Sequence, residues 1–146
     1  MMNRRSFLGT VGTVTGISLA GCVLDLDPIG AGTLVIDNEQ NRSHTLRITV
    51  TKTSDDSDDV PPRSQTPTTS VWRRDQTFEV SGGGRVRKSG FISEPGAFYI
   101  EARSETGESA STWLGLYAAG GGVAERHIYI NIKESGRMFA STPVDD

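Results

Sequence analysis

The chain is predicted to fold as an all-β protein, an antiparallel β-sandwich of about seven to eight short strands. Two observations predict this class. Apolar residues alternate with polar residues along short segments, which is typical of strands that have one face in a core and the other in water. Clusters of Gly, Pro, Asp and Asn separate these segments, as turns do between antiparallel strands. No segment shows a convincing helical period.

Three segments carry the alternation most clearly, at residues 44–52, 97–103 and 127–133, and each places three apolar residues on one face. These residues are Leu46, Ile48 and Val50; Phe98, Ile100 and Ala102; and Ile128, Ile130 and Ile132. Weaker candidate strands span residues 33–36, 70–80, 85–92, 109–117 and 136–140. Turn signals lie between the candidate strands, at residues 37–43, 82–84, 94–96, 105–107 and 120–122.

One candidate strand begins with a recognisable motif. Pro95-Gly96-Ala97-Phe98-Tyr99-Ile100-Glu101-Ala102 resembles the Pro-Gly-x-Tyr-x-Val-x-Ala pattern that commonly begins a strand in immunoglobulin-like sandwiches. The resemblance implies an immunoglobulin-like domain, in which an aromatic residue near the start of the strand closes the corner between the two sheets. The disulfide of antibody domains is absent, because Cys22 is the only cysteine in the chain.

The amino-terminal residues have the layout of a secretory signal. A positively charged start is followed by an uncharged stretch at residues 10–20, which is shorter than the roughly 20 residues that a membrane-spanning helix needs. Arg4-Arg5-Ser6-Phe7-Leu8 resembles the twin-arginine export motif, although Asn3 and Gly9 replace the residues that usually flank it. The resemblance implies that Arg4, Arg5, Phe7 and Leu8 form the export signal.

A second motif follows at the end of the uncharged stretch. Leu19-Ala20-Gly21-Cys22 resembles the lipobox of secreted lipoproteins, in which the cysteine becomes the first residue of the mature chain and carries the lipid. This resemblance implies a lipid on Cys22. A lipid with two acyl chains suffices for stable membrane anchoring without a transmembrane helix.

The motifs divide the chain into three parts. We expect a cleaved signal peptide at residues 1–21, a lipid-anchored tether at 22–32 and the β-sandwich domain at 33–142. The protein is then exported and anchored to the outer face of the cytoplasmic membrane. The basic residues are twelve arginines and three lysines, and this bias, together with an Asp-rich loop, resembles lipoproteins of halophilic archaea.

Composition and residue content argue against several kinds of chemistry. The net charge is −3, and nucleic-acid binding needs clustered Lys and Arg, so we expect no nucleic-acid partner. A blue-copper site needs two His, one Cys and usually a Met. His44, His127 and Met138 are present, but the only cysteine is assigned to the lipid, and both histidines are predicted to lie on the surface.

Other catalytic and metal sites are argued against in the same way. Residues 55–59 hold four aspartates but lack the spacing, central Gly and closing Glu of a calcium loop, so we expect loose cation association only. Residues 107–111 lack the final Gly of a serine-hydrolase elbow. Neither glycine triplet, at 82–84 or 120–122, is part of a phosphate-binding loop. The sequence therefore predicts no catalytic residue, no metal ligand and no cofactor.

Three surface features have a more specific interpretation. Asn41-Arg42-Ser43 is an acceptor sequence for N-glycosylation on Asn41, placed in a polar turn. The charged, Pro-containing stretch at residues 54–69 is predicted to be a mobile, solvated loop. Two basic clusters, at 73–74 and 85–88, would form one patch if the strands that carry them paired.

These observations favour a lipid-anchored extracytoplasmic surface protein that displays a non-enzymatic, immunoglobulin-like interaction module. Its expected partners are the membrane, through the lipid on Cys22, and a protein of the cell envelope. The alternative is a ligand- or cation-binding lipoprotein that serves a membrane transporter or an enzyme complex.

Overall fold

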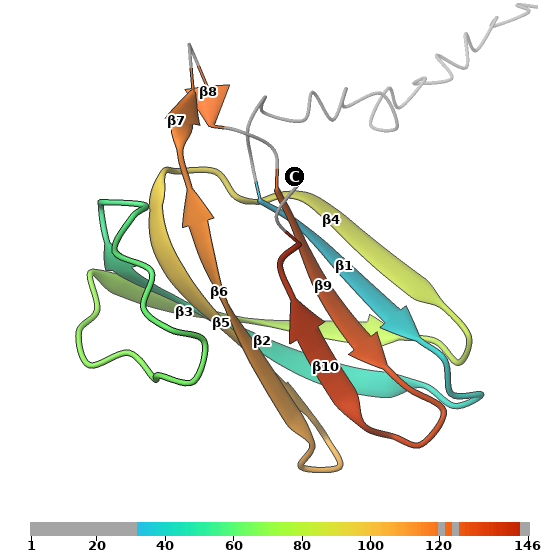
Figure 1. Ribbon diagram of the computed structural model, residues 1–146. Helices are drawn as coiled ribbons and strands as arrows, with labels where there is room; N and C mark the ends of the chain where they lie inside the picture. The colour runs from blue at the N-terminus through green and yellow to red at the C-terminus, as the bar shows by residue number, and fades with distance from the viewer. Residues whose placement is uncertain (1–31, 120–121, 124–125, 144–146) are drawn as a thin grey trace, which may run out of the picture.

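The computed structural model describes residues 32–119, 122–123 and 126–143. The export signal, Cys22 and the first ten residues of the predicted tether lie outside the described residues, so the expectations about them are not addressed by the structure. Eight strands form two sheets, and two further strands form a short ladder of their own (Figure 1). The strands are β1 (Gly32–Asn38), β2 (His44–Ser54), β3 (Trp72–Val80), β4 (Arg85–Ile92), β5 (Gly96–Ser104), β6 (Ser109–Leu116), β7 (Ala118–Ala119), β8 (Gly122–Val123), β9 (Arg126–Ile132) and β10 (Met138–Ser141).

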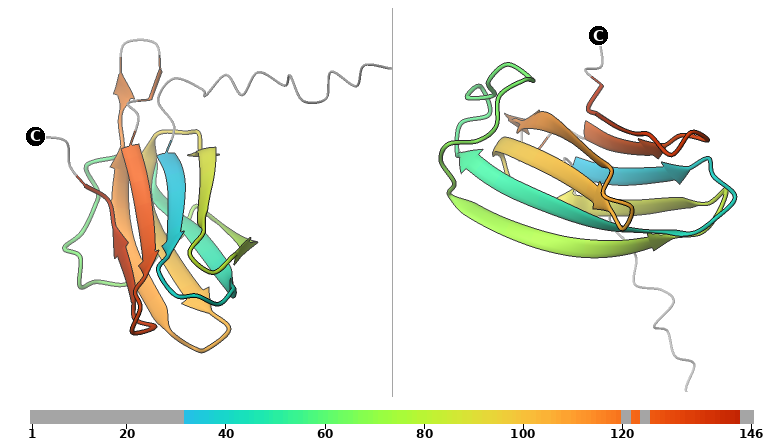
Figure 2. Two further views of the ribbon diagram at one scale, coloured as in Figure 1. Left: turned by 90° about the vertical axis from the view of Figure 1, so that its right-hand side faces the viewer. Right: turned by 90° about the horizontal axis from the view of Figure 1, so that it is seen from below.

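The chain crosses between the two sheets several times, and each sheet takes four strands. Sheet A has the order β10-β9-β1-β4, and sheet B has the order β3-β2-β5-β6. Neighbouring strands are antiparallel except β1 and β9, which run parallel. The two sheets pack face to face (Figure 2). The predicted antiparallel β-sandwich is therefore confirmed, and all eight of its strands fall on predicted segments. The ladder of β7 and β8 was not predicted.

The core lies between the sheets and is built from the alternation seen in the sequence. The nine apolar residues of the three clearest segments are all within 1% of complete burial; they are Leu46, Ile48, Val50, Phe98, Ile100, Ala102, Ile128, Ile130 and Ile132. Burial of one such large side chain contributes about 1.5–3 kcal/mol, so this set supplies much of the driving force for folding. Tyr99, Glu101, Tyr129, Asn131 and Lys133 lie partly exposed on the opposite faces, as predicted.

Hydrogen bonds join the two sheets along the side formed by β6 and β10. Thr142, just after β10, is buried and donates its hydroxyl to the carbonyl oxygen of Trp113 in β6 over 2.7 Å. The hydroxyl of Thr112 lies 3.4 Å from that of Thr142. The edges of the two sheets are thereby connected where no backbone ladder links them.

On the other side of the sandwich, the two strands that carry the basic clusters do not pair with each other. Strand β3 belongs to sheet B and β4 to sheet A, so the pairing on which the patch depended does not occur. The guanidinium of Arg74 lies over the rings of Trp72 and Phe91 and donates to the carbonyl oxygen of Phe91. Arg85 instead forms an ion pair with Asp37 at 2.6 Å. The strand pairing on which a combined basic patch was conditional is therefore absent.

Candidate functional site

Four turns gather at one end of the sandwich, which we call the turn end. It consists of residues 39–43, 81–84, 105–108 and 133–137, each of which connects two strands. The chain enters β1 at Gly32, at the opposite end (Figure 1). The turn end and Gly32 therefore lie at opposite ends of β1.

Asn38 holds two of these turns together. Its side chain is buried, and its amide nitrogen donates to the carbonyl oxygens of Arg42 at 2.8 Å and Ser81 at 3.1 Å. Its side-chain oxygen accepts the backbone N–H of Gln40 at 3.0 Å. One amide group thus satisfies donors and acceptors from two different turns, which an apolar side chain of the same size would leave unpaired.

Gln40 extends this network to the turn at 133–137 and adds a bond to the turn at 81–84. Its side-chain nitrogen donates to the carbonyl oxygen of Glu134 at 3.0 Å, and its own carbonyl oxygen accepts the N–H of Gly83 at 2.7 Å. Gly82 packs so closely that a Cβ atom there would lie 2.4 Å from the carbonyl carbon of Asn41. The turn end is consequently a connected set of turns with a defined shape.

His44 is the first residue of β2 and lies inside this network. Only 3% of it is exposed, so the prediction that it lies on the surface is wrong. Its Nε2 lies 2.5 Å from the side-chain oxygen of Gln40. Its Nδ1 lies 2.9 Å from a carboxylate oxygen of Glu105, within ion-pair distance although not in a hydrogen-bond direction. These two acceptors provide polar partners for a ring that shares the inward face with Leu46.

The surface of the turn end carries two shallow polar recesses. One has a volume of about 310 Å³ and is lined by Glu39, Gln40, Asn41, Arg42 and Glu134. The other, of about 460 Å³, lies between the first two turns and the 133–137 turn and includes Asp37, Arg85 and Asn131. Asn41, the predicted glycosylation site, is exposed at the rim of the first recess.

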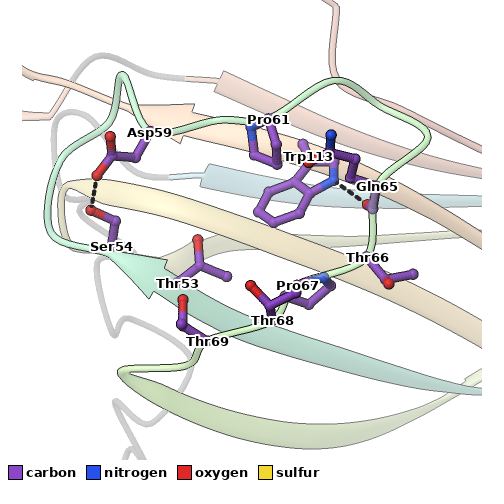
Figure 3. Close-up of a pocket in the computed structure, with 10 residues that line it drawn as sticks. All are labelled: Thr53, Ser54, Asp59, Pro61, Gln65, Thr66, Pro67, Thr68, Thr69 and Trp113. Carbon is purple, nitrogen blue, oxygen red and sulfur yellow. Dashed lines mark hydrogen bonds between the residues drawn. The ribbon is translucent and has the colours of Figure 1, made fainter.

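The second candidate site is formed by the long loop between β2 and β3, residues 55–71. The loop lies on the outer face of sheet B, against Trp113 and Gly115 of β6 (Figure 3). The indole N–H of Trp113 donates to the carbonyl oxygen of Gln65 at 2.9 Å. A Cβ atom on Gly115 would lie 2.6 Å from the carbonyl oxygen of Ser57, so glycine permits the close approach. These contacts hold the loop on the sheet, and Ser57, Val60, Pro61 and Pro67 are partly buried, whereas the other residues of the loop are exposed.

A pocket of about 320 Å³ opens between the two arms of this loop, and we call it the loop pocket. Figure 3 shows the indole of Trp113 between the arms, with Pro61 on one side of it and the threonines on the other. The pocket is lined by Thr53, Ser54, Asp59, Pro61, Gln65, Thr66, Pro67, Thr68, Thr69 and Trp113. One feature of the sequence indicates this packing. Trp113 falls at an outward-facing position of β6, and a large aromatic side chain there is stabilised when other residues pack over it.

The four aspartates at the start of the loop contact different partners. Asp55 pairs with the buried ammonium of Lys52 at 2.6 Å, Asp59 accepts the hydroxyl of Ser54 at 2.6 Å, and Asp56 accepts the N–H of Asp58 at 2.9 Å. Within the described part of the chain, no three metal-ligating side chains come together. The arrangement of these carboxylates is accounted for by turn formation and by the charge of Lys52.

Lys52 closes the end of the core at the start of the loop. Its ammonium lies 2.7 Å from a carboxylate oxygen of Glu94, whose other oxygen accepts the indole N–H of Trp72 at 3.1 Å. Burial alone would lower the pKa of Lys52, but the hydrogen bonds to Asp55 and Glu94 outweigh burial and raise the pKa above its ordinary value. The buried charge of Lys52 is thus paired with the carboxylates of Asp55 and Glu94 at the boundary of the core.

The residues considered for a copper site, His44, His127 and Met138, lie apart from one another in the fold. His127 lies on the outer face of sheet A, where its ring stacks on that of Tyr129 with centroids 5.8 Å apart. Met138 is buried in the core, and His44 belongs to the other sheet. No helix long and apolar enough to cross a membrane occurs among the residues that the structure describes.

Comparison with known proteins gives little further information. No protein-family model matches the chain, and no curated protein matches it significantly. Among solved structures, the fold is similar to the "NMR structure of the protein from Eubacterium rectale", with 12% identity and a TM-score of 0.42. The match covers 83% of this chain and 93% of that one. A similarity at this level supports no inference about function.

Proposed function

We propose that this protein is an exported lipoprotein, anchored to the outer face of the cytoplasmic membrane through a lipid on Cys22, that displays a non-enzymatic, immunoglobulin-like module for binding an envelope protein. The observation that supports the display role is the turn end. It lies opposite Gly32, which is where the anchored tether would join the sandwich. In this orientation the turn end faces away from the membrane.

The structure of the turn end suits recognition of a polar protein surface. Its turns are joined by hydrogen bonds from Asn38 and Gln40, so little conformational entropy is lost when a partner binds. Its recesses are lined by charged and amide side chains, and Glu39 forms an ion pair with Lys133 at 2.7 Å beside them. Complementary charges on a partner would give orientation and specificity.

Asn41 is the proposed site of N-glycosylation on this module. It is exposed, and its backbone is held against Gly82, so the acceptor side chain projects from a fixed turn. A glycan there would stand beside the recess formed by Glu39 and Glu134, and so would restrict which partners reach it.

Intact-mass measurement of the membrane-purified protein tests the anchor and the glycan together. We expect a chain that begins at Cys22 and carries a lipid, with additional mass that Ser43→Ala removes and Cys22→Ser does not. Cys22→Ser should leave the membrane or stay unprocessed, and paired Arg4→Lys and Arg5→Lys substitutions should retain the precursor inside the cell. Processing and membrane retention of Cys22→Ser like those of the wild type would refute the anchor.

The alternative function, a ligand-binding lipoprotein that serves a membrane transporter or an enzyme complex, is favoured by one observation, the loop pocket. A preformed recess over a tryptophan is typical of small-molecule sites. Recovery of a permease or an enzyme with the lipidated protein would favour this alternative.

A further inference from the structure

Strand β3 forms an open edge of sheet B. It lies outermost in the order β3-β2-β5-β6, and β2 pairs with it along its whole length, from Trp72 to Val80. Edge strands are commonly protected from pairing with another chain by Pro, by a bulge or by charges of one sign. β3 contains no Pro, no Gly and no register shift, and its charged side chains are of both signs.

The other edges of the sandwich are less suited to such pairing. Strand β4 carries Arg85, Arg87 and Lys88, so two copies of it would bring like charges together, and a register shift interrupts its pairing with β1. Strand β10 is short, and Thr142, which follows it, is bonded to Trp113 of the edge strand β6. β3 is therefore the edge that best fits a further strand.

Alternate residues of β3 direct their backbone groups to the open side. The N–H of Glu105, which follows β5, donates to the carbonyl oxygen of Thr45 at 3.2 Å, so the backbone of Thr45 faces away from β3. In an antiparallel pair, the residue opposite such a position also faces away, and that residue of β3 is Glu79. Because the direction alternates along a strand, the residues with open backbone groups are Arg73, Asp75, Thr77 and Glu79.

These outward backbone groups are not used elsewhere in the fold. No hydrogen bond between described residues occupies them. The side chains of the same four residues are exposed on the outer face of sheet B. A strand added at this edge would therefore meet both unpaired backbone groups and accessible side chains.

The four side chains are self-complementary in an antiparallel pair. When two copies of β3 pair about Gln76, Arg73 of each copy lies opposite Glu79 of the other, and Asp75 lies opposite Thr77. Residues with open backbone groups then face only one another, as a hydrogen-bonded ladder requires. Opposite charges that face each other across two strands stabilise their pairing.

The nearest registers with the same backbone phase are disfavoured by charge. Pairing about Asp75 would place two copies of that carboxylate opposite each other. Pairing about Thr77 would place Asp75 opposite Glu79. Like charges directly opposite destabilise a strand pair, so the charge pattern selects the register centred on Gln76.

From these observations we propose that β3 pairs antiparallel with β3 of a second copy of this chain, centred on Gln76, so that the two B sheets join into one continuous sheet. The contact lies outside the turn end and the loop pocket, and the proposal does not rest on the lipid anchor or on the envelope partner. A contact through one strand pair is small, so the dimer is expected to be reversible.

Sedimentation equilibrium of the full chain in detergent tests the proposal, at low salt so that the charges are little screened. The variants are Arg73→Glu, Glu79→Arg and the two combined. By symmetry, each single substitution places like charges opposite each other at both ends of the strand pair, whereas the combination restores opposite charges with the signs exchanged. The control is Arg103→Glu, which reverses an exposed charge of β5 on the same face of the sheet.

We expect the wild type, the combined variant and the control to dimerise alike, and each single variant to dimerise about tenfold or more weakly. An equimolar mixture of the two single variants should form a heterodimer, because every facing pair then again holds opposite charges.

The proposal is overturned if the wild type stays monomeric at about 1 mM, a concentration that would reveal a Kd of about 1 mM. Dimerisation of the single variants like that of the wild type, or an equal loss in the control, would also overturn it. So would failure of both the mixture and the combined variant to recover the dimer. None of these results affects the intact-mass test of the anchor.

Discussion

Single polar side chains decide the structure of the turn end. Asn38 and His44 are both buried, and each contacts groups from at least two turns. A buried polar group is tolerated only when its partners are present, because its loss of hydration is otherwise uncompensated. These residues therefore fix the relative positions of the turns as well as their own.

Glu105 gives this network a dependence on pH. Burial raises the pKa of its carboxyl, but the N–H groups of Glu105 and Thr45 and the neighbouring His44 outweigh burial and hold the pKa below its ordinary value of 4.5. A pKa that is lower in the folded state contributes stability above the unfolded-state pKa. This contribution is lost as the pH falls through the folded-state pKa.

We therefore expect Glu105→Gln to be less stable than the wild type at neutral pH, and the difference to shrink as the pH falls below about 4.5. Chemical denaturation at a series of pH values measures it. Glu108→Gln, an exposed residue of the same turn, is the matched control and should show no such trend. A stability difference that stays constant down to acid pH would contradict the assignment.

Among the elements, the loop at 55–71 depends most on close packing. It lies on β6 because Gly115 lets the carbonyl oxygen of Ser57 approach and because Trp113 provides a donor for Gln65. Val60 also lies close to this position, since its Cγ2 would be 3.3 Å from a Cβ added at Gly115. The loop pocket exists only while these contacts hold the loop in place.

Gly115→Ala should therefore displace the loop, because its methyl group would meet a backbone oxygen that cannot rotate away. Overpacking of this kind costs about 1–3 kcal/mol in the free energy of unfolding. Faster tryptic cleavage after Arg63, an exposed loop residue, would report the displacement. Gly32→Ala is the control, since its nearest contacts would be 3.4 Å. Equal cleavage rates in both variants would refute the packing argument.

At the scale of the whole molecule, the arrangement of strands places the two candidate sites on different parts of the surface. The four turns lie at the end opposite Gly32, whereas the loop pocket lies on the outer face of sheet B. If the tether leads from Gly32 to the membrane, the turn end is the part most accessible to another envelope component. The proposed display function follows from this polarity of the fold.

A photo-crosslinking amino acid introduced at position 42 tests this orientation in intact cells. Arg42 is exposed at the turn end, and we expect crosslinks there to one discrete envelope protein. The same probe at Ser93, exposed in the turn between β4 and β5 at the other end, is the control and should give none. Crosslinks at Ser93 alone would reverse the proposed orientation.

The sequence alone predicted all eight strands of the sandwich and nine of the apolar residues of its core. This was possible because alternation depends on local backbone geometry, in which successive side chains of a strand point to opposite faces. The same alternation places His44 in phase with Leu46, although its polarity suggested the surface. His44 is buried because its ring nitrogens lie against Gln40 and Glu105, and these two residues come from two different turns.

Only the tertiary structure decided which strands share a sheet. It placed β3 and β4 in different sheets, and it laid β1 parallel to β9, which lies much later in the chain. It also placed the 55–71 loop on Trp113, which created the loop pocket. These contacts join residues that are far apart in sequence, so they leave no periodic pattern along the chain. Strand positions were thus determined locally, whereas both candidate sites arise from long-range packing.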